Sequence, residues 1–427
     1  MAYIKVGTVG EVALKRKVDM SLCVQEERRV VSQAPSQAVI DRLVRQVHEI
    51  GPFLREQAII ADRNRMLPTA SVEALAAADV WRLSTLQRYG GYEGGAQMLL
   101  EVARTVGYYD PSAAWCVVIS NGSVMLMNRF PDEVLDEVHR NGPVRAASIF
   151  AQPQGTAVPD GEGWRISGKW PFASNSNHSE WALGILFIKS HAEDEDKSRV
   201  GFVLMHRDEF EIEDTWYTIG MRGSGSNTMV TENLWVPKNR VITFEALMGA
   251  VPEADANETF GRRLTPHLTM STTIQAPSLG AAYAALDYTN GLANKRGITY
   301  THYAKQSDSG AFVQNLGSTS IMIDSAKLLL ERSAAAIDLA ASGDVPLPLE
   351  ERARHRAGIG HAGHELVEAV NELCWLHGTA SFAENSFLGR MWRDINTGTR
   401  HASITAPMGY ELHGNALTAT PYISTKL

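Results

Sequence analysis

The sequence contains little cysteine and no long hydrophobic run. Its 427 residues include only three cysteines, Cys23, Cys116 and Cys374, which are widely separated and form neither a CxxC pair nor a disulfide framework. Such sparse cysteine usage is typical of a reducing compartment. No stretch approaches the roughly 18 uninterrupted apolar residues of a membrane-spanning helix, and the N-terminus lacks the apolar segment of a secretion signal. These absences predict a cytoplasmic protein with no membrane partner.

The chain also lacks an excess of positive charge. It has 40 Lys+Arg against 48 Asp+Glu, for a formal net charge of −8, and no block of like charges. Binding to the phosphates of a nucleic acid requires a local excess of lysine and arginine, so we expect no nucleic-acid partner. Hydrophobic residues make up 44% and charged residues 21%. This is an ordinary globular composition, and the length corresponds to two or three packed units.

Several common catalytic motifs are absent. The sequence has no GxxxxGK[ST] phosphate loop, no GxGxxG opening a βαβ unit, no HExxH and no GxSxG. His361 and His364 have a spacing that places them on one helix face, but no third ligand is suggested nearby, so we predict no metal site. The sequence is therefore still compatible with a globular enzyme or a ligand-binding protein that uses none of these motifs.

Residues 36–144 are predicted to form an N-terminal helical domain. From Ile40 onward, apolar residues recur at three- and four-residue steps, and residues 96–129 are helical with an interruption at Asp110-Pro111-Ser112. Residues 1–35 show no sustained periodicity and are predicted to be an N-terminal extension.

Residues 145–245 are predicted to form a central β domain, and residues 246–427 a C-terminal helical domain. Short runs rich in β-branched and large apolar residues, separated by polar or glycine-rich loops, predict a small barrel or sandwich. The expected strands span 164–170, 183–189, 200–205 and 230–236, and the expected long helices span 268–293, 311–341 and 350–380.

This α–β–α order, with TIGMRGSGSNTMVTENLWVP (218–237) at its centre, resembles the acyl-CoA dehydrogenase superfamily. Further matches are Tyr89-Gly90-Gly91, IQAPSLGAAYAALD (274–287) and Arg393-Asp394. The resemblance implies an α+β fold with an N-terminal helical domain, a central small β-barrel and a C-terminal four-helix bundle. It also implies a flavin between the last two domains, and a homotetramer in which a neighbouring subunit completes the cofactor site.

The general base of the dehydrogenases is absent. In most of them a glutamate lies eight residues after the aspartate of the Arg-Asp pair, where this chain has Ala402, preceded by His401. Other members carry the base at the start of the long helix, but no acidic residue occurs between Arg263 and Asp287. A methyl group cannot remove the α-proton of a thioester, so dehydrogenation is not expected.

SGKWPFASNSNHSEW (167–181) and RMWRDINTGTRHAS (390–403) resemble the flavin-dependent monooxygenase branch of this superfamily. That branch includes two-component phenol hydroxylases, dibenzothiophene monooxygenase and amino-sugar nitrososynthases. The resemblance implies an oxygenase component that takes reduced FAD or FMN from a separate NAD(P)H-flavin reductase. With O2 it forms a C4a-hydroperoxyflavin that oxygenates a small aromatic, polyketide or amine substrate. The chain has no nicotinamide fingerprint of its own.

The resemblance also suggests catalytic and substrate-binding residues. Ser174 matches the serine that bonds flavin N5, Ser148 a serine near the substrate hydroxyl, and His401 the active-site histidine on the C-terminal helix, which accepts a phenolic proton or bonds the hydroperoxide. Where several members have a second histidine, this chain offers only Ser120 and Asn121 as hydrogen-bonding groups. Arg263 is a further candidate for substrate contact.

The expected cofactor-binding residues lie in two groups. Arg296 and Gln314 match positions that reach the neighbouring subunit's cofactor, and Gly378 and Ser381 match a glycine-containing turn. Trp170 and Phe172, with Trp216, are candidates to wall the isoalloxazine, although aromatic residues in a β-core usually serve packing.

Two alternatives remain open at this stage. One is an acyl-CoA dehydrogenase or oxidase with a displaced base, and the other is a non-catalytic flavin or ligand binder on the same scaffold. The residues do not distinguish FAD from FMN, C-hydroxylation from N- or S-oxygenation, or a biosynthetic from a degradative role.

Overall fold

The computed structural model describes residues 34–148, 152–191, 193, 199–249, 259–343 and 346–422. Residues from Ser32 onward form one compact unit. The predicted extension at residues 1–35 therefore lies almost wholly outside the described residues.

The N-terminal part is helical, as predicted. Its helix α4 is buried along its whole length, and Asp110 caps it by accepting hydrogen bonds from the backbone N–H groups of Ser112 and Ala113. This cap, followed by a proline in the first turn, is the physical cause of the predicted interruption. The helices are α1 (Gln37–Asn64), α2 (Thr69–Ala77), α3 (Ala96–Tyr109), α4 (Pro111–Met127) and α5 (Asp132–Val138), with 3-10 turns η1 (Val80–Arg82) and η2 (Gln87–Tyr89).

The central part is one eight-stranded sheet in the order β6-β7-β3-β2-β4-β5-β8, with β1 parallel to β4. All four predicted strands are present. The strands are β1 (Ala146–Ser148), β2 (Gly155–Asp160), β3 (Gly163–Ala173), β4 (Trp181–Ile188), β5 (Val200–His206), β6 (Glu211–Glu213), β7 (Asn227–Pro237) and β8 (Val241–Thr243). The 3-10 turns among them are η3 (Ser176–His178), η4 (Arg207–Glu209), η5 (Arg222–Ser224) and η6 (Lys238–Arg240).

Trp170 forms the core of this sheet. Its indole is fully buried, and its Nε1–H donates to the carbonyl of Ile185 at 2.7 Å. Three glycines make room for it: a Cβ on Gly155, Gly168 or Gly184 would lie 2.6, 2.4 or 2.9 Å from the ring. Trp170 therefore packs the sheet and leaves no ring face for a flavin, contrary to its predicted role.

The C-terminal part is helical again. Its helices are α6 (Phe244–Met248), α7 (Phe260–Arg263), α8 (Pro266–Thr273), α9 (Ala276–Leu292), α10 (Gly310–Ser342), α11 (Leu349–His377), α12 (Phe387–Gly398) and α13 (Ala406–Thr418), with 3-10 turns η7 (Gln306–Asp308), η8 (Thr379–Phe382) and η9 (Ala402–Ile404). The single helix expected over 268–293 is wrong. It breaks at Ile274 and Gln275, because Pro277 has no N–H to donate and its ring opposes a continuous helix.

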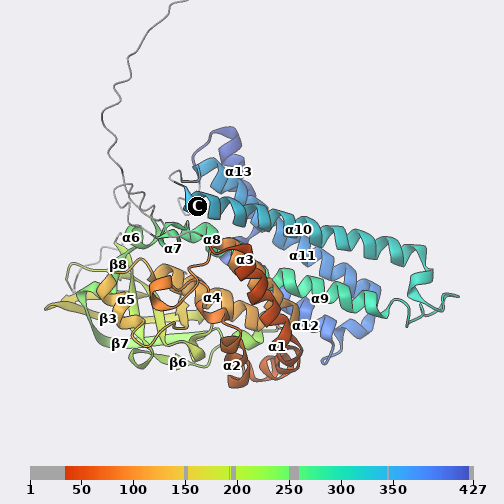
Figure 1. Cartoon of the computed structure of the whole chain (residues 1–427), viewed down its shortest axis with the longest axis horizontal. Helices are drawn as coiled ribbons and strands as arrows, with labels where there is room; N and C mark the ends of the chain where they lie inside the picture. The colour runs from red at the N-terminus through yellow and green to blue at the C-terminus, as the bar shows by residue number, and fades with distance from the viewer. Residues whose placement is uncertain are drawn as a thin grey trace, which may run out of the picture. The chain divides into compact units, whose positions relative to one another are not determined.

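Helices α3 and α4 join the sheet to the C-terminal helices. α4 packs on β1 and α9, and α3 packs on α9, so that in Figure 1 both lie between the strands and the blue-green helices. The predicted fold class is thus confirmed. None of the described helices is both long and apolar enough to cross a membrane.

Candidate active site

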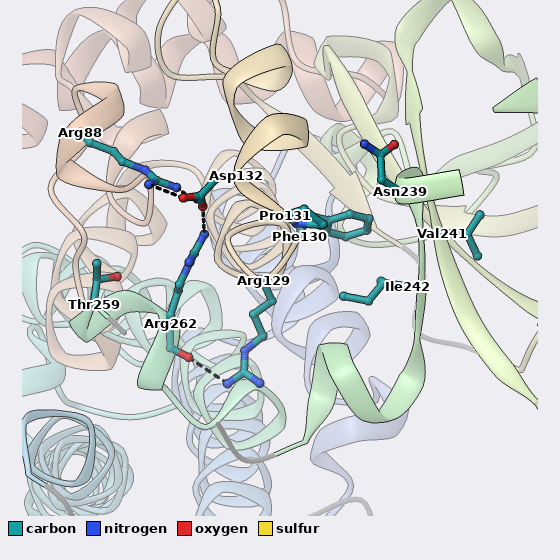
Figure 2. A pocket seen from close by; sticks show the side chains of 10 residues that line it. All are labelled: Arg88, Arg129, Phe130, Pro131, Asp132, Asn239, Val241, Ile242, Thr259 and Arg262. Carbon is teal, nitrogen blue, oxygen red and sulfur yellow. Dashed lines mark hydrogen bonds and ion pairs between the residues drawn. The ribbon is translucent and has the colours of Figure 1, made fainter. Parts of the chain in front are cut away.

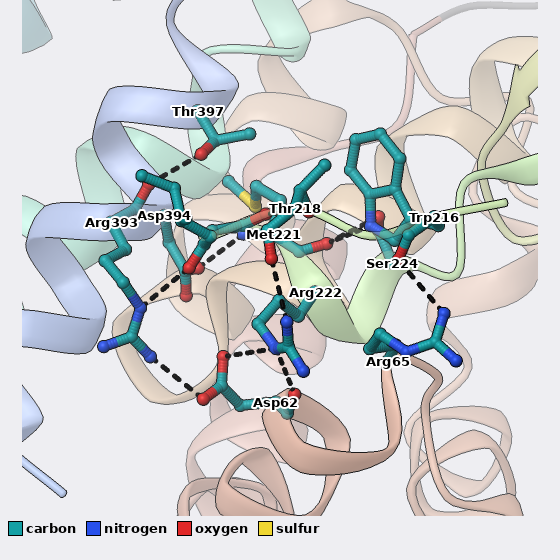
Figure 3. Close-up of polar contacts among 12 residues, drawn as sticks. Asp62, Arg65, Trp216, Thr218, Met221, Arg222, Ser224, Arg393, Asp394 and Thr397 are labelled. Atoms are coloured by element: carbon teal, nitrogen blue, oxygen red, sulfur yellow. Dashed lines mark hydrogen bonds and ion pairs between the residues drawn. The ribbon is translucent and has the colours of Figure 1, made fainter. Parts of the chain in front are cut away.

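The glycine-rich segment 218–226 packs directly on α12, so the two motifs that the sequence singled out lie together. The Met221 N–H donates to Asp394 Oδ1 at 2.6 Å, and Arg393 Nε donates to the Ile219 carbonyl at 2.8 Å (Figure 3). A Cβ on Gly220 would lie 2.1 Å from the Arg393 carbonyl oxygen, so only glycine permits this approach.

Asp62 of α1 joins this pair of segments to the N-terminal helices. Its carboxylate pairs with Arg393 at 2.9 Å, and its backbone carbonyl accepts from Arg222 Nε at 2.6 Å (Figure 3). Burial raises the pKa of Asp394 to about 7, with nearby Asp62 and Asp110 acting in the same direction. The junction of all three parts of the chain is therefore built from a partly buried ion pair, a buried carboxyl group and close backbone contacts.

A row of hydroxyl groups runs from this junction to the end of β3. Trp115 Nε1 of α4 donates to Ser174 Oγ at 3.0 Å. Ser174 Oγ lies 2.7 Å from Ser226 Oγ, which lies 2.7 Å from Ser224 Oγ. Ser224 Oγ donates to the Met221 carbonyl at 2.7 Å. The predicted Ser174 is thus the outer member of a buried hydroxyl row.

His401 lies on the other side of Trp115, with the two ring centroids 5.8 Å apart in an edge-to-face arrangement. It is not on a helix as expected, because α12 ends at Gly398 and His401 caps the 3-10 turn η9. Its Nδ1 lies 2.8 Å from Ser403 Oγ and accepts the Ser403 N–H at 3.3 Å, and this N–H contact favours the tautomer with the proton on Nε2. Trp115 therefore brings together two of the predicted catalytic residues.

The imidazole of His401 is a weak base. His401 is exposed in the single chain, but protein atoms surround its ring and, with the positive charge of Arg356, lower its pKa to about 4. The ring is neutral at pH 7. In this tautomer it offers an Nε2–H donor.

The residues predicted to contact the substrate differ in which hydrogen-bonding groups the protein leaves unused. Ser148, at the end of β1, lies with its Oγ 2.8 Å from that of Ser123 on α4. Ser120 Oγ accepts the Ala146 N–H at 3.1 Å. Asn121 is fully buried and bonds only backbone groups: its Oδ1 accepts from one N–H, and its Nδ2 donates to two carbonyls. Asn121 therefore has no amide N–H left for a substrate, and its side chain is not accessible to one.

Three of the four residues predicted to hold the cofactor's phosphates lie close together around the end of α11. Arg296 Nη1 lies 2.9 Å from His377 Nδ1, at the end of α11 next to Gly378. Gly378 has φ +81, and a Cβ there would meet no atom within 4 Å. Ser381 Oγ donates to the Gly378 carbonyl at 2.6 Å. Gln314 is exposed near the start of α10.

Two other predicted residues remain, Phe172 and Arg263. Phe172 is 65% exposed at φ +67, within the register shift between Trp170 and Ala173, with its ring centroid 6.3 Å from that of Trp216. Arg263 is partly buried at the end of α7.

The residues around Ser174 and Trp115 fit a flavin. Three buried polar atoms in this region, Asn175 Oδ1, Ser176 Oγ and Ser278 Oγ, have no hydrogen-bond partner among the described residues. A Cβ on Gly398 would lie 3.3 Å from both Ser278 Oγ and the Trp115 ring, which places Ser278 beside Trp115. A heterocycle that carries both N–H and C=O groups matches this mixture of donors and acceptors.

A hollow of about 680 Å³ lies among α5, β8 and α7 (Figure 2). Asp132 accepts there from Arg88 and from Arg262, and these guanidinium groups hold the pKa of its carboxyl well below the usual range. Arg129 donates to three backbone carbonyls. These arginines have structural contacts, and none of the lining residues belongs to the Ser174–His401 set.

Sequence reasoning missed Trp115, Ser224, Ser226 and Ser123. The first of these carries a recognisable signal, because a tryptophan in a buried helix needs an acceptor for its Nε1–H. The two serines of the 218–226 segment were part of a quoted motif, but their partners become visible only in the folded chain.

The comparisons with known proteins agree with this geometry. Residues 272–406 match the family described as "Acyl-CoA dehydrogenase, C-terminal domain". The chain is 29% identical over 380 residues to the flavin-dependent monooxygenase oxygenase subunit HsaA of Rhodococcus jostii (strain RHA1). The matched region covers 88% of this chain and 97% of that protein. It is 26% identical to the FADH(2)-dependent resorcinol hydroxylase, oxygenase component, of Rhizobium sp. (strain MTP-10005), over 85% of this chain and 90% of that one.

Solved structures give the same result. XiaF from Streptomyces sp., in complex with FADH2 and glycerol, superposes with a TM-score of 0.88 at 36% identity, over 91% of this chain and 98% of that chain. The fold and the vacant base position define a flavin-dependent monooxygenase of the acyl-CoA dehydrogenase fold. The chain belongs to this family, and it uses reduced flavin. The predicted family, enzyme class and cofactor are confirmed, and the oxygenase-subunit names of the relatives imply a separate partner component.

Proposed function

We propose that this protein is the oxygenase component of a two-component system that hydroxylates a small aromatic compound. Reduced FAD or FMN comes from a separate NAD(P)H-flavin reductase, and O2 is the co-substrate. The observation that carries the proposal is the convergence of Ser174 and His401 on Trp115. The relatives named for resorcinol and for indole-3-acetate support an aromatic substrate.

Reduced flavin, when bound, supplies the electrons that activate O2. Ser174 accepts a hydrogen bond from flavin N5–H and so holds that proton in place. Trp115 fixes Ser174 from one side and packs against His401 on the other. His401 donates its Nε2–H to the oxygen that is transferred or to the substrate, because a ring with a pKa of about 4 is a poor acceptor for a phenolic proton.

Ser148 and Ser120 are proposed to orient the substrate, with Ser123 fixing the hydroxyl of Ser148 at 2.8 Å. Arg263 stays a candidate for substrate contact. Asn121 is not part of this proposal, because its amide is used by the backbone.

Arg296, Gly378 and Ser381 are proposed to bind the cofactor's phosphates, since a guanidinium lies beside an open glycine turn. Gln314 is proposed to reach the cofactor of a neighbouring subunit in a homotetramer. The exposed apolar residues along the same helix support this: Val313, Ile321 and Leu328 are 52, 65 and 65% exposed in the single chain.

The test is the coupling of flavin oxidation to product formation in Ser174→Ala. The protein is mixed with chemically reduced flavin, substrate and O2, and product and hydrogen peroxide are measured together. We expect flavin still to bind but peroxide to form at the expense of product. Unchanged coupling removes Ser174 from the site, and reduction of an electron-accepting dye by an acyl-CoA thioester, without reductase, supports the dehydrogenase alternative instead.

A further inference from the structure

The protons of the hydroxyl row can be placed by counting. Three short oxygen–oxygen contacts link Ser174 to Ser226, Ser226 to Ser224 and Ser224 to the Met221 carbonyl, each at 2.7 Å. Two oxygens this close need a proton between them. Three serine hydroxyls supply three protons, and a carbonyl supplies none.

Only one arrangement satisfies all three contacts. Ser224 donates its hydrogen bond to the Met221 carbonyl, so Ser226 must donate to Ser224 and Ser174 must donate to Ser226. Ser174 Oγ in turn accepts from Trp115 Nε1. Its own proton and one lone pair are therefore used within the protein, and what Ser174 has left is a single acceptor lone pair.

The surroundings keep the row in this direction. The three serines are 5, 4 and 2% exposed, from Ser174 to Ser224, so bulk water does not compete for their protons. The Met221 carbonyl at the end of the row is held in place, because it also accepts from Trp216 Nε1 at 2.9 Å while the Met221 N–H bonds Asp394. Reversing the row would leave two buried oxygens 2.7 Å apart without a proton between them.

We infer that Ser224 and Ser226 are positioning residues that turn Ser174 into a pure acceptor, and that the site thereby selects reduced flavin over oxidised flavin. This inference rests on the proposed contact between Ser174 and flavin N5. Reduced flavin has an N–H at N5, which an acceptor binds. Oxidised flavin has a lone pair there, which faces the Ser174 lone pair with no proton between them. The site thus binds the form that a reductase delivers and releases the oxidised form.

The experiment measures the dissociation constants of oxidised flavin and of dithionite-reduced flavin, both without O2 and without substrate. Ser226→Ala frees the Ser174 proton to rotate toward N5. Oxidised flavin should then bind roughly tenfold more tightly while reduced flavin changes little. The ratio of the two constants should fall about tenfold, which is about 30 mV for a two-electron couple. Ser224→Ala should act in the same direction, because it removes the step that directs Ser226.

Three further variants serve as controls. Ser226→Thr keeps the hydroxyl and should keep the parent ratio. Ser333→Ala removes a buried hydroxyl that bonds Leu329 and His355 in the helical bundle, and it should leave both constants unchanged. Ser174→Ala should weaken mainly reduced flavin, the opposite pattern to Ser226→Ala.

Each outcome separates the two proposals. If Ser174→Ala weakens reduced flavin while Ser226→Ala and Ser224→Ala leave the ratio at the parent value, the inference about the row is overturned and the Ser174 assignment stands. If Ser174→Ala changes neither constant, Ser174 is not at N5, and both proposals are overturned. If Ser226→Ala is unstable, the comparison of Ser224→Ala with Ser226→Thr decides the matter by the same ratio.

Discussion

At the scale of single residues, the site pairs a donor with an acceptor. The Ser403 N–H donates to Nδ1 of His401, which favours a proton on Nε2, while the serine row leaves Ser174 with a lone pair. The Met221 carbonyl sets the direction of the serine row, and the hydroxyl and backbone N–H of Ser403 both face Nδ1 of His401. The chemistry that each side chain offers is therefore set by neighbours that do not touch the substrate.

His401→Ala should slow the oxygen-transfer step by roughly ten- to ten-thousand-fold, the range for one proton-handling group. His401→Asn should recover part of the rate, because an amide N–H replaces the Nε2–H donor. With a pKa of about 4, the parent rate should show no inflection near pH 6.5 from this residue. Single-turnover kinetics with pre-reduced flavin measures the rates of both variants and the pH dependence of the parent rate. A normal rate in His401→Ala would reject the proposed role of His401.

Asp394 makes the free energy of unfolding depend on pH. Its pKa is about 7 in the folded chain against 3.8 as the ordinary value, so between these values the folded state binds more protons and loses stability as the pH rises. Asp394→Asn removes this titration and keeps an oxygen for the Met221 N–H. Relative to the parent, the variant should gain roughly 2–4 kcal/mol between pH 5 and pH 8. Urea midpoints at both pH values test this, and a difference independent of pH contradicts it.

At the scale of secondary-structure elements, close backbone contacts decide where the segments lie. The 218–226 segment reaches α12 because Gly220 lets its backbone approach Arg393, and α1 joins both through Asp62. Within the sheet, three glycines on β2, β3 and β4 surround the Trp170 indole. Glycine is needed at these positions for space, since none of the three has a positive φ.

Gly168→Ala tests this packing in the sheet. The added methyl would lie 2.4 Å from the Trp170 ring and 2.9 Å from the Gly155 backbone, so we expect a loss of roughly 1–3 kcal/mol in the free energy of unfolding. Gly414→Ala on α13 is the matched control, because a Cβ there meets nothing within 4 Å and alanine favours the helix by about 1 kcal/mol. Equal urea midpoints for Gly168→Ala and the parent would contradict the account.

At the scale of the whole molecule, the single chain leaves an apolar helix face uncovered. Ile321 and Leu328 of α10 are seven residues apart on one face, and each is 65% exposed. On α11, Trp375 is 81% exposed. Burial of such a face between copies of the chain agrees with the proposed homotetramer.

A parent mass of four chains is expected from light scattering at micromolar concentration. Ile321→Glu combined with Leu328→Glu should lower the mass toward dimer or monomer, because two carboxylates would be buried without partners. Ile59→Glu, at a 50% exposed position of α1, is the control and should keep the parent mass. A monomeric parent would rule out the tetramer.

The sequence by itself determined the order of helical and β segments and the class of the enzyme. Both are recorded locally: the former in apolar spacing and in breaks such as Asp110-Pro111, the latter in the alanine at position 402 where a dehydrogenase carries its base. The tertiary structure alone decided which of the candidate residues lie together. Ser174 meets Trp115, 59 positions away, and Ser226, 52 positions away, while Trp170, four residues before Ser174, packs the sheet. Hydrogen-bond direction and burial depend on such long-range contacts, which local spacing does not specify.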